Sequence, residues 1–293
     1  MKAKILKTII GLAIIAMVSI LLIIAYFMLV DIQTKMPNQE EYTCNVEAKQ
    51  FMGRNIFVLT PKNVEKANLM ILYFHGGSYM AEATQGHWDF LEKIVNDTGA
   101  TIIFPDYPLS PKYSYKDVFR MVVPLYKEVI DHINPENLVM MGDSAGGGLS
   151  LALEERLCEE NIEMPSKTIL ISPWLDVRLT NPEIDEVQKF DKQLNKETLK
   201  LAGLAYSRED GIDSYLVNPI DGDLSGLKNV VIYTGTYDIL NPDVHVLAQR
   251  AKEQGVEIQI KEYEGASHIW IIQNEEDEKE LVQKAYSDLV SDL

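Results

Sequence analysis

The sequence is poor in cysteine and in positive charge, and both shortages narrow the classes of protein to consider. It has two cysteines, Cys44 and Cys158, in 293 residues. Two thiols make no disulfide framework and their spacing fits no metal motif, so free thiols are expected and a pair stays open. Lys and Arg number 27 against 44 Asp and Glu, a net charge of −17 that argues against nucleic acid as a partner.

Charge of either sign is absent from Thr8–Val30, a run of 23 residues. Such a run is long enough to cross the hydrocarbon core of a bilayer, about 30 Å, as a helix. A cleaved signal peptide would have a shorter apolar region and a small-residue cleavage site, and this run has neither. Three lysines precede the run and an aspartate follows it. The positive-inside bias therefore predicts an uncleaved signal anchor over residues 1–30, single-pass in the cell membrane, with the N-terminus cytoplasmic and the remaining domain extracytoplasmic.

From residue 55 onward, short apolar or β-branched runs alternate with stretches of helical spacing. This alternation predicts βαβ units and a mainly parallel sheet with helices on both faces, an α/β fold. The expected strands are 55–60, 69–74, 101–106, 137–141, 167–172, 229–235 and 257–263. The expected helices are 87–99, 115–132, 146–160, 242–254 and 275–290.

One stretch, 176–219, is too long for a single crossover between two strands. It contains a candidate helix at 195–206 and no clear strand. We therefore expect it to form, with residues 31–54, a cap over one end of the sheet in a single domain that spans 31–293. That domain carries a net charge of −20, because the three lysines of the first thirty residues are left out. So acidic a domain also argues against a polybasic grip on anionic lipid.

A serine stands in the stretch Gly142-Asp143-Ser144-Ala145-Gly146, between a predicted strand and a predicted helix. G-x-S-x-G in a strand–turn–helix context is the pattern of a nucleophile elbow. The turn is so tight that side chains at the two outer positions would clash, which explains the glycines. A phosphate-binding loop is excluded, because neither G-K-[ST] nor G-x-G-x-x-G occurs. Ser144 is thus a candidate nucleophile, against the alternative of an incidental serine at a glycine-rich helix start.

A serine hydroxyl needs a base, and the base needs an orienting carboxylate. In a strand–turn–helix arrangement of this kind both follow the serine in chain order. Among five histidines, only His268 lies in a loop after the last predicted strand. Asp238 lies just past the strand 229–235 and is the preferred acid. Asp243 and Glu264 remain rivals, although a helix start explains the first and an exposed position the second.

Backbone donors for an oxyanion are the last part of such a site. The H-G-G sequence after the strand 69–74 places Gly76 and Gly77 in a loop at the carboxyl end of the sheet. Glycines allow backbone N–H groups to face a ligand without obstruction. These two residues and Ala145, which follows the serine, are therefore predicted to form an oxyanion hole. An ordinary glycine turn is the alternative.

Several motifs occur together and in order: "HGGS", "DYPLSP", "GDSAGG", "SPWLD", "GTYDIL" and "EGASH". As a set they make the chain, over roughly residues 65–275, resemble the α/β-hydrolases of the hormone-sensitive-lipase-like carboxylesterase family. The resemblance implies an α/β-hydrolase fold and a helical cap over the active site. It also implies that Ser144, Asp238 and His268 form a catalytic triad.

The chain departs from the family pattern in two of these motifs. Ser78 stands where the family commonly has a third glycine, so an altered pocket shape is expected rather than loss of activity. Pro108 and Lys112 stand where the family commonly has an arginine and an acid, so the ion pairing of that loop is expected to differ. Ser78, Tyr79 and Trp174 are the candidates for the substrate pocket.

The expected function is that of a serine carboxylesterase, which hydrolyses short- to medium-chain acyl esters through an acyl-enzyme. The expected partners are a small-molecule ester and, through the N-terminal helix, the membrane. Neither a metal nor an organic cofactor is needed. Two alternatives remain: an amidase or peptidase on the same triad, and a non-catalytic ligand-binding module on a hydrolase fold. Substitution of Ser144 separates the last, since a binding protein tolerates alanine there.

Overall fold

The structure, a computed structural model, describes residues 17, 19, 29–208, 210–273 and 276–293. The membrane anchor predicted over residues 1–30 lies almost entirely outside these ranges. Within them, no helix combines the length and the apolarity that a membrane span requires.

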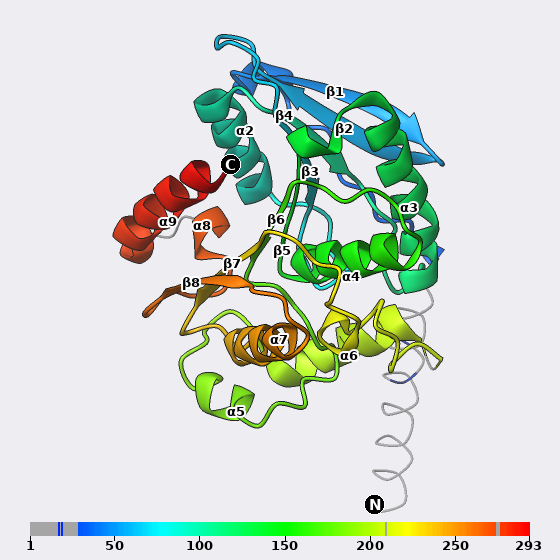
Figure 1. Cartoon of the computed structure of the whole chain (residues 1–293), viewed down its shortest axis with the longest axis vertical. Helices are drawn as coiled ribbons and strands as arrows, with labels where there is room; N and C mark the ends of the chain where they lie inside the picture. The colour runs from blue at the N-terminus through cyan, green and yellow to red at the C-terminus, as the bar shows by residue number, and fades with distance from the viewer. Residues whose placement is uncertain (1–16, 18, 20–28, 209, 274–275) are drawn as a thin grey trace, which may run out of the picture.

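The centre of the molecule is an eight-stranded sheet with the order β1-β2-β4-β3-β5-β6-β7-β8 (Figure 1). The last six strands in this order pair in parallel, whereas β1 and β2 pair antiparallel at one edge. The mainly parallel sheet predicted from the sequence is thus confirmed. The strands are β1 (Asn45–Phe51), β2 (Arg54–Thr60), β3 (Met70–Phe74), β4 (Thr101–Pro105), β5 (Leu138–Asp143), β6 (Lys167–Ile171), β7 (Val230–Gly235) and β8 (Gln259–Tyr263).

The first strand corrects, for residues 45–54, the prediction that residues 31–54 belong to a cap. Its residues instead pair along their whole length with β2 in a hairpin at the sheet edge. Met52 and Gly53, with φ of 51° and 80°, make the turn. Only Val46 of β1 is buried, so the strand lacks the apolar alternation by which a sequence signals a half-buried strand.

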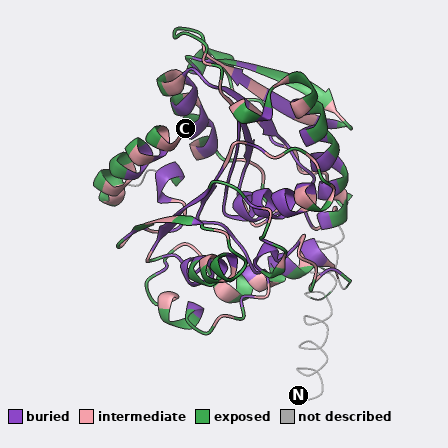
Figure 2. Ribbon diagram, viewed as in Figure 1, coloured by how far each residue is buried: buried purple, intermediate pink, exposed green. Residues whose placement is uncertain are grey.

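Helices cover both faces of the sheet, as predicted. One face carries α3 (Tyr115–His132), α4 (Ala145–Glu159) and α7 (Asn241–Glu253), and the other carries α2 (Gln85–Thr98), α8 (Trp270–Gln273) and α9 (Lys279–Asp292). Strand β5 shows why: Leu138 and Met140 enter the core under α3 and α4, whereas Val139 and Met141 enter the core under α2 and α9. All of β5 is buried, as Figure 2 shows for the central strands. Burial on both faces is typical of parallel strands.

The stretch 176–219 contains helices α5 (Ile184–Val187) and α6 (Lys196–Ser207) and, as predicted, no strand. The buried side of α6 joins the core cluster of α3 and α4. We call residues 176–219 the insertion. Short 3-10 turns complete the described elements at Gln39–Glu41, Pro135–Asn137, Pro219–Asp221 and Glu276–Glu278.

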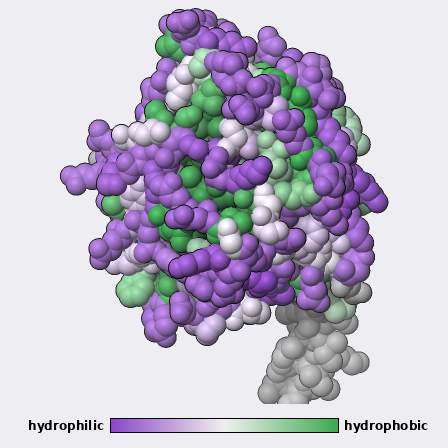
Figure 3. All heavy atoms as spheres, in the orientation of Figure 1, coloured by the Kyte–Doolittle hydropathy of each residue, from purple (hydrophilic) through white to green (hydrophobic). Residues whose placement is uncertain are grey.

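The surface agrees with the acidic composition. The face drawn in Figure 3 is largely hydrophilic, and its apolar residues gather in patches toward the centre. Cys44 is buried and Cys158 is half-buried, and both thiols are free.

Candidate active site

Ser144 lies in the turn between β5 and α4, with a φ of 51° and a ψ of −119°. A positive φ is strained for serine and persists only where the surroundings hold it. Here the end of β6 does so. The Ser144 N–H donates to the Ile171 carbonyl at 2.9 Å, and the Ser144 carbonyl accepts the Trp174 N–H at 2.8 Å. The predicted nucleophile elbow is therefore present in the backbone.

The two outer glycines of the motif are required by the close approach of neighbouring backbone. A Cβ added to Gly142 would lie 2.4 Å from the Gly146 carbonyl oxygen. A Cβ added to Gly146 would lie 2.0 Å from the Phe74 carbonyl oxygen, at the end of β3. Either side chain would force the turn away from the sheet.

The structure brings the three side chains predicted as a triad into one chain of contacts. Nε2 of His268 lies 3.0 Å from Oγ of Ser144, and Nδ1 of His268 lies 2.8 Å from Oδ2 of Asp238. Asp238 follows β7 and His268 follows β8, so the carboxyl ends of neighbouring strands place both side chains. All three residues are buried.

The protonation of His268 depends on a balance between burial and charge. Burial alone lowers the pKa of His268, but the charge of Asp238 and the hydrogen bond to it act in the opposite direction, helped by Asp191 and Asp143. The net effect raises the pKa of His268 above its usual value of 6.5. Asp191 comes from the insertion and accepts the Ile239 N–H at 3.0 Å, so the insertion is part of the site.

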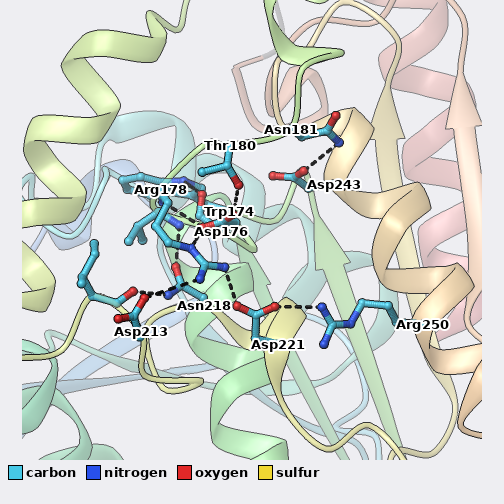
Figure 4. Close-up of polar contacts among 12 residues, drawn as sticks. Trp174, Asp176, Arg178, Thr180, Asn181, Asp213, Asn218, Asp221, Asp243 and Arg250 are labelled. Atoms are coloured by element: carbon cyan, nitrogen blue, oxygen red, sulfur yellow. Dashed lines mark hydrogen bonds and ion pairs between the residues drawn. The ribbon is translucent and has the colours of Figure 1, made fainter.

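The two rival acids do not meet His268. Oδ1 of Asp243 accepts a hydrogen bond from the Asn181 amide at 3.0 Å, as Figure 4 shows. Within the described residues, its other oxygen has no hydrogen-bond partner, and burial raises the pKa of Asp243 to about 6. Glu264 is exposed. Of the candidate acids, only Asp238 is in contact with the imidazole.

A network of ion pairs joins the first residues of the insertion to helix α7 (Figure 4). Nε of Arg178 lies 2.7 Å from the Asp176 carboxylate, in the segment after β6. The same guanidinium pairs with Asp221, and Asp221 also pairs with Arg250 of α7 at 2.8 Å. The first residues of the insertion are therefore tied through Asp221 to α7.

The oxyanion loop differs from the prediction at its first glycine. The Gly76 N–H donates to Oδ1 of Asp143 at 3.0 Å, so the prediction that it serves the oxyanion is wrong. A Cβ on Gly76 would lie 2.9 Å from Cβ of Ser144, which shows that the loop passes directly beside the nucleophile. Three nearby N–H groups have no acceptor within the described part of the chain. They belong to Gly77, Ser78 and Ala145.

Asp143 is a residue of the site that the motif did not single out, since it occupies a variable position of G-x-S-x-G. Besides the Gly76 N–H, its carboxylate accepts the Tyr73 hydroxyl at 2.7 Å and faces Nε2 of His87 at 3.3 Å. Burial raises the pKa of Asp143, but the His87 charge and the hydrogen bonds from His87 and Tyr73 outweigh burial and lower it. A charged Asp143 therefore fixes the loop beside Ser144.

A buried stack of aromatic rings lies against the first turn of α4. The rings of Tyr79 and Tyr206 are 3.6 Å apart and within 4° of parallel, and the Trp174 ring lies 5.7 Å from that of Tyr79. Gly148 joins the stack to the elbow, because a Cβ there would lie 3.0 Å from the Tyr79 hydroxyl. The sequence singled out Tyr79 and Trp174, whereas Tyr206 was missed because the insertion carries no motif. Ser78 precedes Tyr79 with a φ of 55°.

The described residues contain no group of three or more His, Cys, Asp and Glu side chains arranged to hold a metal ion.

Comparison with known proteins agrees with this fold. Residues 71–272, more than half of the chain, match the family model described as alpha/beta hydrolase fold. An esterase of Acinetobacter venetianus is 31% identical over 202 residues, 68% of this chain and 66% of that protein. An acetyl-hydrolase of Streptomyces hygroscopicus is 27% identical over 203 residues, 68% of this chain and 67% of that protein. The chain thus spans about two thirds of the length of these relatives.

Among solved structures, a hormone-sensitive lipase from a metagenome library superposes with a TM-score of 0.79. The match has 22% identity and covers 86% of this chain and 87% of that one. At this identity the likeness shows the fold. Together with the family model, it shows that this chain belongs to the alpha/beta hydrolase fold family.

Proposed function

We propose that this protein is a serine carboxylesterase that hydrolyses short- to medium-chain acyl esters through an acyl-enzyme on Ser144. The observation that carries the proposal is the unbroken chain of contacts from Ser144 through His268 to Asp238, with separations of 3.0 and 2.8 Å. These are hydrogen-bond distances, which proton transfer to a general base requires.

In the first half of the reaction, Oγ of Ser144 attacks the ester carbonyl carbon while Nε2 of His268 takes its proton. Asp238 holds the imidazole with its proton on Nδ1 and stabilises the imidazolium that forms. The tetrahedral intermediate then collapses: the carbon–oxygen bond to the alcohol breaks, and His268 returns the proton to the leaving alcohol. In the second half, water attacks the acyl-enzyme by the same route and releases the acid.

The negative charge of the tetrahedral intermediate falls on the former carbonyl oxygen. We assign its donors to the N–H groups of Gly77, Ser78 and Ala145, in place of the Gly76 N–H that Asp143 engages. Loss of one such donor typically slows the chemical step by about 10²–10³. Because the donors are backbone groups, Ser78 serves here as well as the usual glycine would.

Two observations support a short acyl chain. The rings of Tyr79, Trp174 and Tyr206 fill space beside the first turn of α4 and are buried. A relative that is 27% identical is an acetyl-hydrolase. These rings leave little volume beside the elbow, and this favours small acyl groups, because a long acyl chain would need space that the rings already occupy.

We further propose that residues 1–30 anchor the enzyme in the membrane and that the catalytic domain lies outside the cytoplasm. The uncharged run of 23 residues, preceded by lysines, supports this topology. Reporter enzymes fused after Leu293 test it. Activity of an extracytoplasmic reporter is expected, and activity of a cytoplasmic reporter alone would reverse the topology.

The test of the catalytic proposal is hydrolysis of p-nitrophenyl esters from acetate to palmitate by wild type and Ser144→Ala. We expect the highest kcat/KM at short chains and a loss of at least about 10⁴-fold in the variant. Activity retained by a folded Ser144→Ala protein would exclude Ser144 as the nucleophile. Hydrolysis of amides but not of esters would favour the amidase instead.

A further inference from the structure

The first residue after the uncharged run, Asp31, is already bound to the folded domain. Val30 is the last residue of that run, and Asp31 already pairs with Arg54 at 2.6 Å. Asp31 also accepts the Tyr113 hydroxyl at 3.2 Å and lies 3.7 Å from Nζ of Lys112. The uncharged run and the folded domain are therefore joined without a free linker.

Arg54 makes this attachment rigid. It is buried, and its guanidinium donates to the carbonyl oxygens of Ile32, Asp106 and Tyr107 at 2.8–3.1 Å. Three residues after Asp31, the Thr34 N–H donates to the Asp106 carboxylate at 2.8 Å. Asp106 and Tyr107 directly follow β4, so the chain enters the domain at the carboxyl ends of the parallel strands. That is also the edge at which Ser144 lies.

The entry point constrains how far the domain can stand from the end of the run. An extended chain spans at most about 3.3–3.6 Å per residue. With Asp31 already held, no extended residues are available to let the domain move away. If the run crosses a bilayer, the entry point at Asp31 and the loop after β4 lie next to the lipid headgroups.

Helix α6 presents apolar side chains to solvent beside this entry point. Leu201 and Leu204, three positions apart and thus on one side of the helix, are 68% and 55% exposed. Arg208, at the end of α6, donates to the carbonyl oxygens of Pro111 and Lys112, in the same loop that contacts Asp31. In Figure 1, α6 and the beginning of α3 lie at the same, lower end of the molecule.

A second exposed apolar pair lies on the insertion and the loop after β7. The rings of Phe190 and Tyr237 stack with centroids 5.1 Å apart, and each is more than two-fifths exposed. Tyr237 directly precedes Asp238, so this pair too belongs to the active-site edge. We call Leu201, Leu204, Phe190 and Tyr237 the apolar rim.

The charges around the apolar rim indicate which lipid it suits. Of the lysines nearest to it in sequence, Lys189 pairs with Glu186 and Lys200 with Glu197, whereas Lys192 has no ion-pair partner among the described residues. The domain as a whole carries −20. No excess of positive charge attracts anionic lipid, so contact with a bilayer would depend on apolar side chains entering it.

We propose that the apolar rim rests in the surface of a zwitterionic bilayer and that the ester substrate reaches Ser144 from the lipid side. The substrate class is then amphipathic esters dissolved in the bilayer, with the short acyl group directed to Ser144. Helix α6 connects the apolar rim to the active site. Leu201 and Leu204 lie on its exposed side, and Tyr206 on its buried side stacks on Tyr79 of the oxyanion loop. This inference rests on the membrane anchor and the esterase activity proposed above.

Fluorescence depth measurements test the geometry without using activity. Full-length protein with Cys158→Ser is reconstituted in phosphatidylcholine vesicles, with a single environment-sensitive dye at Leu204→Cys or, as control, at Val64→Cys. Cys44 is buried and stays in place. Val64 is also an exposed aliphatic residue, and its loop between β2 and β3 lies at the opposite end of the molecule (Figure 1). We expect lipid-borne quenchers to reduce emission at least about threefold more at position 204 than at position 64.

A kinetic comparison tests access from the lipid. Two substrates are compared: an acetyl ester of a long-chain alcohol in vesicles, and soluble p-nitrophenyl acetate. The kcat/KM for the first is divided by the kcat/KM for the second. In the double variant Leu201→Gln/Leu204→Gln this ratio is expected to fall about fivefold or more. The control Val64→Gln keeps the wild-type ratio.

The outcomes separate this inference from the proposals beneath it. Equal quenching at positions 204 and 64 in vesicle-bound protein overturns the inference and leaves the anchor and the esterase intact. Protein that fails to bind vesicles overturns the anchor and the inference together. Absence of any Ser144-dependent ester hydrolysis overturns the esterase and the proposed access route, while the quenching still reports whether the rim touches lipid.

Discussion

His268 contacts two groups that act on it in opposite ways at the same time. On Nδ1 the Asp238 carboxylate favours the imidazolium, and on Nε2 the Ser144 hydroxyl needs a neutral nitrogen to accept its proton. Burial favours the neutral ring, but the charge of Asp238 outweighs it and the pKa of His268 is raised. At the residue scale, catalysis is therefore expected to depend on pH through this one imidazole.

The first prediction concerns that pH dependence. As pH rises through the pKa of His268, the ring becomes neutral and kcat/KM increases, so the midpoint of the acidic limb is expected above 6.5. In Asp238→Asn the charge is lost, the pKa of His268 falls, and the midpoint moves to lower pH while kcat falls by about 10⁴. The pH profile of p-nitrophenyl acetate hydrolysis measures both effects. An unmoved midpoint in the variant would mean that Asp238 does not set the pKa of His268.

The second prediction concerns the closeness of the oxyanion loop to the nucleophile. A Cβ at Gly76 would lie 2.3 Å from Oδ2 of Asp143 and 2.9 Å from Cβ of Ser144. Asp143 cannot move aside freely, because Tyr73 also holds it. Gly76→Ala is therefore expected to lower kcat/KM at least about 100-fold and the free energy of unfolding by about 1–3 kcal/mol. Ester hydrolysis and thermal unfolding measure the two effects, and near-wild-type activity would contradict the arrangement.

At the scale of elements, α4 differs from a surface helix because nearly all of its residues are buried. It follows Ser144 and packs between the sheet, α3 and the insertion, so two of its charged residues, Glu154 and Glu155, are buried. Glu154 is fully buried. Burial raises the pKa of Glu154 to about 8, and the Thr168 side chain opposes this effect only in part. The helix that positions Ser144 thus carries a carboxyl group whose protonated form is favoured by burial.

The third prediction follows from the sign of this shift. The folded state binds the proton of Glu154 up to about pH 8, whereas the unfolded chain releases it near 4.5. The free energy of unfolding therefore falls as pH rises between these values. Glu154→Gln, which resembles the protonated acid, is expected to stabilise the protein at pH 9 by about 1–2 kcal/mol and to change it little at pH 4. Urea unfolding at the two pH values measures the difference. Equal effects at both would show that Glu154 does not titrate in this range.

On the scale of the whole molecule, Arg54 joins parts of the chain that are far apart in sequence. Its guanidinium pairs with Asp31 and, at 3.1 Å, with Asp106, so that the segment at Asp31, the strand β2 and the loop after β4 meet at one buried charge. The side chain of Asp106 is inaccessible to solvent. Burial raises the pKa of Asp106, while the Thr34 N–H and Arg54 oppose that effect.

The fourth prediction is that Arg54→Ala destabilises the domain by about 3–5 kcal/mol at neutral pH, because it leaves Asp106 buried without its cation. The pKa of Asp106 then rises further. The loss in free energy of unfolding is therefore expected to become smaller as pH falls and the carboxyl group becomes protonated. Chemical unfolding at pH 7 and pH 4.5 measures this, with Arg120→Ala, an exposed arginine, as the control. A loss no larger than that of Arg120→Ala would show that the contacts of Arg54 with Asp31 and Asp106 do not stabilise the domain.

Much of this molecule was predictable because local patterns and nearby contacts agree. The parallel strands are short apolar runs between amphipathic helices, and their predicted bounds differ from the observed ones by a residue or two. The roles of Ser144 and His268 rest on chain order and on a turn whose glycines have a steric cause. The hairpin of β1 was not predictable, because its stability comes from pairing with β2 rather than from apolar side chains of its own.

The sequence by itself determined the parallel sheet, the elbow at Ser144 and the order in which Asp238 and His268 follow it, since periodicity and steric demand act over a few residues. Only the tertiary structure decided that Asp238 rather than Asp243 meets His268. It also decided that Asp143 engages the Gly76 N–H and that Tyr206 stacks on Tyr79. Most of these contacts join residues that are far apart in the chain, and in one of them two acceptors compete for the same N–H donor. Which partner is chosen depends on how the helices and strands pack, and no local sequence pattern encodes that packing.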